Sequence, residues 1–272
     1  MKKSMGIFVV STTIALMTIT ANPAHAQEAQ DDEELARQTQ NPVANLISLP
    51  FQNNTNFGLG TNDRTQNVLN IQPVIPFGLG ANWNLITRAV APLITQPDLA
   101  ATSGSTTGFG DILLTAFVSP KQPGKLIWGA GPAISIPVGK EGLSAEKWAL
   151  GPSVLVLTMS GPWVVGALVN NIWSVGGDAN LGDVNSMLIQ YFINYNFPSG
   201  LYLTSAPINT ANWEADAGNK WTVPLGGGAG RVFRLGRQPI NANAQAYYNV
   251  VTPDDFGANW QFRFQLQLLF PK

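Results

Sequence analysis

Apolar and polar residues alternate near the end of the chain, in the stretch W-Q-F-R-F-Q-L-Q-L-L-F at 260–270. The residues of one parity are all apolar, and the other parity holds Gln261, Arg263, Gln265 and Gln267. Because successive side chains of a β-strand point to opposite faces, this spacing predicts a strand with one apolar and one polar face. In a soluble sandwich the apolar face would meet a second sheet, whereas in an outer-membrane barrel it would meet lipid.

The same strand-like pattern recurs along the chain, between intervals rich in turn residues. The predicted strands are 49–58, 67–76, 82–94, 109–118, 126–137, 148–159, 163–173, 185–197, 201–208, 221–233, 240–250 and 260–270. Short connections such as S-G-P alternate with long ones such as T-Q-P-D-L-A-A-T-S-G-S-T-T-G. This alternation is typical of short periplasmic turns and longer external loops. We therefore predict an all-β fold, a transmembrane antiparallel up-and-down β-barrel of about 12 strands, over residues 49–272.

Aromatic residues gather at the predicted strand ends. One set would mark the periplasmic side: Phe77, Trp83, Trp163, Phe197, Phe233 and Phe270. A second set would mark the outer side: Trp148, Trp173, Trp221 and Trp260. Two such belts are typical of the two membrane interfaces, because an amphipathic ring suits the level of the lipid headgroups. The belts favour the barrel over the sandwich.

The first residues predict export from the cytoplasm. Lys2 and Lys3 precede an apolar run at 6–20, and Ala24-His25-Ala26 has the form of a cleavage site, so residues 1–26 are predicted to be a signal peptide. Residues 27–48 would form an N-terminal segment with a short helix around 32–38. Its acidic residues could simply be solvated in the periplasm, or the segment could fold into the lumen as a plug.

Composition narrows the classes of function. Charged residues make up 11% of the chain, against roughly 25% in soluble domains. Without Lys2 and Lys3, 13 basic residues face 16 acidic ones, a formal charge of −3, so no basic surface predicts nucleic-acid binding. The chain has no cysteine, and its one histidine, His25, lies in the predicted signal peptide. Nucleophilic machinery built on histidine or cysteine is thereby excluded from the processed chain, and we predict that it is not an enzyme and needs no cofactor.

Strands with clear parity predict which side chains line the lumen. A charge that faces lipid near mid-membrane costs ~2–4 kcal/mol, which favours an inward position for arginine. The candidates are Arg88, Asp111, Asn241, Asn243, Gln245, Tyr247, Arg263 and Gln265. The inward charges could line a conduction path or close into a salt-bridge network. The many asparagines and glutamines indicate a wet interior with weak charge selectivity.

Several stretches together resemble a bacterial outer-membrane family that is named for the meta-pathway of phenol degradation. They include N-P-V-A-N-L-I-S-L-P-F-Q at 41–52, W-A-L-G-P at 148–152, W-T-V-P-L-G-G-G-A-G at 221–230, A-Y-Y-N-V-V at 246–251 and the closing L-L-F-P-K. The resemblance covers nearly the whole processed chain. It implies a β-barrel that passes small organic compounds, including aromatic or hydrophobic ones, and it brings no catalytic motif.

Two functions follow from the sequence. The first is an outer-membrane channel or facilitator, whose partners would be membrane lipid and a small-molecule solute. The second is a non-conducting structural or surface-interaction barrel. The acidic residues of the long connections could simply reflect the polarity of loops, or they could bridge divalent cations to lipopolysaccharide. The C-terminal strand would engage the barrel-assembly machinery.

Overall fold

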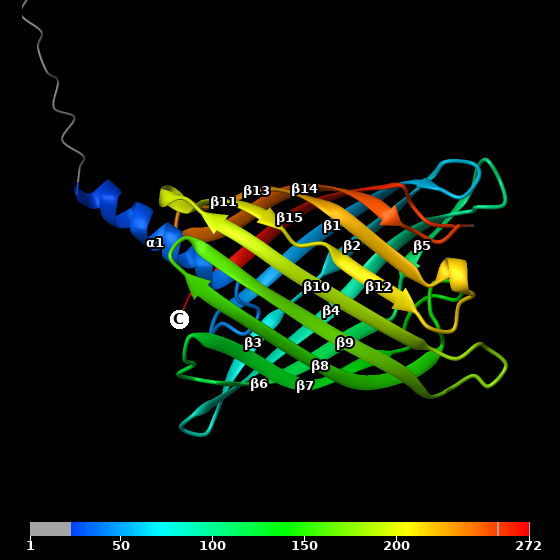
Figure 1. Ribbon diagram of the computed structural model, residues 1–272, viewed down its shortest axis with the longest axis horizontal. Helices are drawn as coiled ribbons and strands as arrows, with labels where there is room; N and C mark the ends of the chain where they lie inside the picture. Colours follow the sequence, from blue (N-terminus) through cyan, green and yellow to red (C-terminus); the bar gives the residue numbers. More distant parts are fainter. Residues whose placement is uncertain (1–22, 255, 272) are drawn as a thin grey trace, which may run out of the picture.

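Twelve antiparallel strand positions close into a β-barrel in the computed structural model, which describes residues 23–254 and 256–271 (Figure 1). The strands are β1 (Ile47–Leu59), β2 (Arg64–Ile71), β3 (Val74–Leu79), β4 (Trp83–Pro97), β5 (Ser105–Phe109), β6 (Ile112–Pro120), β7 (Leu126–Ile136), β8 (Lys147–Ser160), β9 (Trp163–Gly177), β10 (Asn185–Asn196), β11 (Leu201–Ser205), β12 (Ile208–Asn212), β13 (Trp221–Leu235), β14 (Gln238–Val251) and β15 (Trp260–Phe270). Pairing of β1 with β15 and of β9 with β10 completes the ring. The predicted barrel of about 12 strands is confirmed.

Three of the twelve positions hold two strands each: β2 with β3, β5 with β6, and β11 with β12. The predicted strands 67–76, 109–118 and 201–208 each extend across one of these breaks. At the first break, Pro73 has no N–H to donate to a ladder, and such residues interrupt strands. Hydrogen bonds on either side of it, from the Gln72 N–H to the Pro50 carbonyl and from the Ala89 N–H to the Pro73 carbonyl, keep the wall continuous (2.9 and 3.1 Å).

The two ends of the barrel differ (Figure 1). At one end, called here the turn end, neighbouring strands are joined by the short connections 80–82, 121–125, 161–162, 197–200 and 236–237. The other end, the loop end, carries the short connection 60–63 and the longer connections 98–104, 137–146, 178–184, 213–220 and 252–259. Helix α1 (Pro23–Thr39) lies at the turn end, beside the short 3-10 helix η1 (Pro198–Gly200), and extends beyond the predicted helix at 32–38. None of the helices described is both long and apolar enough to cross a membrane.

Alternating side chains give the wall two different faces. On β15, Phe264 is 47% exposed on the outward face while its neighbour Arg263 is 2% exposed inside the barrel. Exposed aromatic rings pair edge to face near the strand ends, as Trp163 does with Tyr195 at the turn end and Tyr248 with Trp260 at the loop end. An outer surface of exposed apolar side chains between aromatic pairs suits contact with lipid.

The outward face also carries a polar cluster on β1 and β2. Asn53 and Asn67 exchange two amide hydrogen bonds (2.9 and 3.0 Å), and the Thr55 hydroxyl joins both side chains. Their ladder partners on β15 include the exposed Phe264 and Phe262, which places the cluster on the outer surface. An amide that faces lipid is costly unless it is hydrogen-bonded, so the reciprocal pairing makes this position tolerable.

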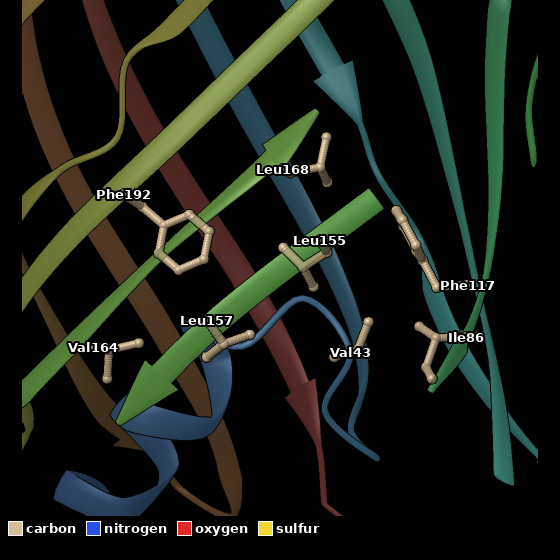
Figure 2. Packing of buried hydrophobic residues seen from close by; sticks show 8 residues of the cluster. All are labelled: Val43, Ile86, Phe117, Leu155, Leu157, Val164, Leu168 and Phe192. Carbon is tan, nitrogen blue, oxygen red and sulfur yellow. The ribbon is translucent and has the colours of Figure 1, made fainter. Parts of the chain in front are cut away.

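The interior is divided into a polar and an apolar half. Strands β1, β14 and β15 point asparagine and glutamine side chains inward. Strands β4, β6, β8, β9 and β10 instead supply an apolar cluster: Ile86, Phe117, Leu155, Leu157, Val164, Leu168 and Phe192. Figure 2 shows Val43 among these side chains, carried by the segment that precedes β1. The N-terminal segment therefore packs inside the barrel against its apolar half.

Candidate functional site

Two cavities occupy the barrel lumen. The inner cavity, of about 180 Å³, lies toward the turn end and is bordered there by residues 38–42 of the N-terminal segment. The outer cavity, of about 340 Å³, lies toward the loop end, where Pro253, Phe256 and Gly257 form part of its wall. Arg263 lines both cavities, so its side chain lies where the two approach each other.

Arg263 is held in place by neutral groups. Its guanidinium donates to the Asn54 side-chain oxygen at 3.0 Å, the Ala206 carbonyl at 2.8 Å and the Gln261 side-chain oxygen at 3.2 Å. It also lies 5.0 Å from the centre of the Tyr247 ring, a cation–π geometry. With contacts to three strands and to the β11–β12 connection, the side chain forms a partition between the cavities.

The Ala206 carbonyl is available to Arg263 because the wall is interrupted there. The ladder to β13 runs as far as the pair Thr204–Gly228 and resumes only at Thr210–Thr222. Within this gap the Ala206 N–H donates to the Tyr247 hydroxyl at 3.1 Å. Tyr247 in turn donates to the Gln245 side chain. Lumen side chains thus take over main-chain hydrogen bonds that a continuous sheet would supply.

Arg88 also lines the inner cavity. It is an inward residue of β4, between Val74 on β3 and Thr115 on β6. Its Nη2 donates to the Gln72 side-chain oxygen at 2.6 Å. Gln72 is fixed in turn by the break in the strand at Pro73. Within the described part of the chain, neither Arg88 nor Arg263 forms an ion pair.

The residues predicted for the lumen fall into two groups. Those that line the inner cavity are Arg88, Asn241, Asn243, Gln245, Arg263 and Gln265, and Tyr247 is fully buried behind them. Asp111 lies apart and lines neither cavity. Its carboxylate accepts hydrogen bonds from the Gly139 and Ala145 N–H groups (3.2 and 2.8 Å), which fixes the loop at 137–146. The Asp111 carboxylate is therefore engaged with the loop and not with a lumen arginine.

Sequence reasoning missed the apolar wall of the inner cavity. Leu168 and Phe192 belong to the apolar cluster and also line the cavity. Strand β8 illustrates why: both of its parities are largely apolar, so the inward set with Leu155 cannot be separated from the outward set with Val154. Amides on one wall and hydrocarbon on the other suit a solute with an apolar body and a polar group.

The N-terminal segment lies across the turn end of the inner cavity. Gln40 and Asn196 exchange two side-chain hydrogen bonds (2.8 and 3.0 Å), and Arg37 donates to the Gly161 carbonyl. Farther along, Val43 is 5% exposed in the apolar cluster. Opposite it is a glycine: a Cβ added at Gly129 would lie 2.9 Å from a Val43 methyl carbon. The barrel wall thus provides space for this side chain.

Comparisons with known proteins agree with this architecture. The family described as "Putative MetA-pathway of phenol degradation" matches residues 49–268. An outer membrane channel from Pseudomonas putida F1 is similar in structure, with a TM-score of 0.63 and 16% identity over 83% of this chain and 94% of that one. Outer membrane phospholipase A from Escherichia coli is more distant, with a TM-score of 0.44 and 13% identity over 82% and 92% of the two chains. No curated protein matches the chain.

Proposed function

Since the chain belongs to the family described as "Putative MetA-pathway of phenol degradation", we propose that it is an outer-membrane channel for the passive passage of small organic compounds, aromatic or hydrophobic ones among them. It carries no catalytic role in this proposal. One observation supports it above the others: the two lumen cavities are lined in common by a single side chain, Arg263. A modest displacement of that side chain would join them.

The lining supports the class of solute. Leu168 and Phe192 offer an apolar surface on one side of the inner cavity, and amides such as Gln52 and Gln265 offer hydrogen bonds on the other. A sugar would find few partners on the apolar wall, whereas a single aromatic ring with a polar substituent would find both. Passage requires binding that is favourable but weak, and neutral amides meet that condition.

We infer that the N-terminal segment acts as a plug. It is docked by Val43 and by the Gln40–Asn196 pair, and it borders the inner cavity. Its release would widen the path to the turn end, which would face the periplasm. The predicted signal peptide at 1–26 lies mostly outside the described residues and remains a prediction.

Location and partners belong to the same proposal. The exposed apolar outer face would lie in the lipid of the outer membrane. The acidic loops of the loop end would face the cell exterior and meet lipopolysaccharide through divalent cations. Strand β15 would carry the signal for the barrel-assembly machinery.

The alternative function is a non-conducting barrel with a structural or surface-binding role. The buried partition at Arg263 and the docked segment at Val43 favour it, because both narrow the lumen. It would require that neither element moves on the time scale of solute passage.

Current through a planar lipid bilayer separates these functions. The processed chain would be compared with a variant that lacks residues 27–44. We expect small steady currents from the processed chain and larger ones from the variant, because the docked segment narrows one mouth. Absence of current in both, from protein that migrates as a folded barrel, would reject the channel and leave the structural role.

A further inference from the structure

We propose that the inner cavity binds the carboxylate of a small aromatic acid at Arg88, and that the lumen prefers anions to cations. The inference deepens the proposed channel function by naming a class of solute. It departs from the weak charge selectivity that the many lumen amides would suggest. Three features point to it: the free donors of Arg88, the absence of acidic side chains among the described residues that line the cavities, and the apolar residues of the cavity wall.

Arg88 has unused hydrogen-bonding capacity. A guanidinium carries five N–H donors, and within the described residues the Arg88 guanidinium makes one hydrogen bond, to Gln72. The side chain is partly buried and lines the inner cavity. Arg263, in contrast, has three acceptors and a ring around it. Arg88 is therefore the group that is free to bind a carboxylate through two parallel hydrogen bonds.

No acidic residue of the described lumen competes for this role. None of the fifteen strands contains Asp or Glu, and neither cavity has an acidic side chain in its lining. The acidic residue that the sequence predicts for the lumen, Asp111, is engaged with the backbone of the loop at 137–146. Two guanidinium groups thus face the lumen without a countercharge. Charge of one sign inside low-dielectric walls concentrates ions of the opposite sign, and arginine is a recurring element of anion pores.

The wall around Arg88 favours an apolar body on the anion. Val74, next to Arg88 across the β3–β4 ladder, lines the inner cavity together with Leu168 and Phe192. The inner cavity has a volume of about 180 Å³. That space suits one aromatic ring with its carboxylate. Acetate and phosphate would meet the charge but leave the apolar wall uncovered.

Benzoate and its neutral isostere benzamide test the site directly. Binding to the full processed chain in detergent micelles would be measured by titration calorimetry. We expect benzoate to bind about tenfold more tightly than benzamide, and more tightly than acetate or phosphate, because it gains charge-assisted hydrogen bonds and covers the apolar wall. Arg88→Gln should remove the difference between benzoate and benzamide. Arg88→Lys, which keeps the charge but loses the planar fork, should keep part of it.

Arg231→Gln is the matched control. It removes the same charge from the outward face of β13, where Arg231 is exposed and paired with the exposed Leu201. We expect benzoate affinity to be unchanged in this variant. Equal affinity of the native protein for benzoate and benzamide, or an unaltered preference in a folded Arg88→Gln variant, would overturn the proposal.

The reversal potential across a salt gradient tests the preference of the lumen for anions. We expect the native protein to be anion-selective, with Arg88→Gln closer to neutral and Arg231→Gln unchanged. The outcomes also separate the two proposals. Benzoate binding without any current would reject the channel and support the Arg88 site. Current without anion preference, together with equal binding of benzoate and benzamide, would reject the Arg88 site and leave the channel.

Discussion

Replacing Val43 with aspartate should release the part of the N-terminal segment around position 43 from the barrel interior. Val43 is 5% exposed and contacts the apolar cluster formed by side chains such as Phe117 and Leu155. The cluster offers a carboxylate no hydrogen-bond donor from its own members, so an aspartate at this position would be desolvated without compensation. The barrel itself is closed by its strand ladders and does not depend on this contact.

The free energy of undocking can be estimated from the contacts that the substitution removes and those that remain. Burying a valine stabilises the docked state by about 1.5–3 kcal/mol, and that contribution is lost. A buried carboxylate adds a penalty of roughly several kcal/mol. Against these terms stand the two Gln40–Asn196 hydrogen bonds, at about 0.5–1.5 kcal/mol each, and the bond from Arg37 to Gly161. Helix α1 keeps contacts of its own, because Leu35 and Ala36 pack with Tyr202 and Val232 in a second buried cluster. The sum favours undocking of the segment around position 43.

Single-channel current and limited trypsin digestion report on different consequences of undocking. We expect Val43→Asp to conduct more than the native protein. We also expect faster cleavage after Arg37, because its side chain is no longer held against Gly161. Val43→Ala, which stays apolar, should have an intermediate effect.

The reasoning would be refuted if Val43→Asp, folded as a barrel, showed native current and native resistance at Arg37. Faster cleavage with unchanged current would refute the narrower claim that the docked segment narrows the path. Both results are informative because the variant changes only a side chain that no strand ladder requires.

Three further predictions concern the wall and the partition. Arg263→Gln should raise the single-channel conductance, since a shorter neutral side chain cannot span the contacts that separate the cavities, whereas Arg263→Lys should stay nearer the native value. In the cysteine-free chain, Gln265→Cys should react with a charged thiol reagent, and Phe264→Cys should react only with a lipid-phase reagent; the reverse pattern would mean that the faces are misassigned. Gly131→Ala should prevent refolding, because the added Cβ would lie 1.8 Å from the Ala116 carbonyl oxygen on β6. The refolding yield can be measured by heat-dependent gel migration, and a yield equal to that of the native protein would contradict this prediction.

The fold could be predicted from the sequence wherever apolar and polar residues alternate regularly along a strand. On β14 and β15 the polar parity identifies the inward face, which places Asn243, Gln245 and Arg263 together without any tertiary information. The alternation of short and long connections adds the up-and-down topology. These signals are local, because membrane and lumen impose opposite demands on adjacent residues of a strand.

The division of the interior could not be read in the same way. On β8 and β9 both faces are apolar, one toward lipid and one toward the lumen, so the pattern loses its information about direction. The docking of Val43 depends on a glycine about 85 residues away in the sequence, Gly129, which no local pattern connects to it. The prolines at the strand breaks, Pro73 between β2 and β3 and Pro207 between β11 and β12, can be found in the sequence. The effect of the breaks on the lumen side chains cannot. The break between β11 and β12 exposes main-chain groups at Ala206 that form hydrogen bonds with Arg263 and Tyr247.

Uptake of benzoate into liposomes that contain the protein tests the central claim most directly. The rate would be compared among protein-free vesicles, vesicles with the native protein and vesicles with Val43→Asp. The account predicts faster uptake with the native protein than without protein, and faster uptake again with the variant. Equal rates in all three, with the barrel folded and inserted, would contradict a channel for small organic compounds.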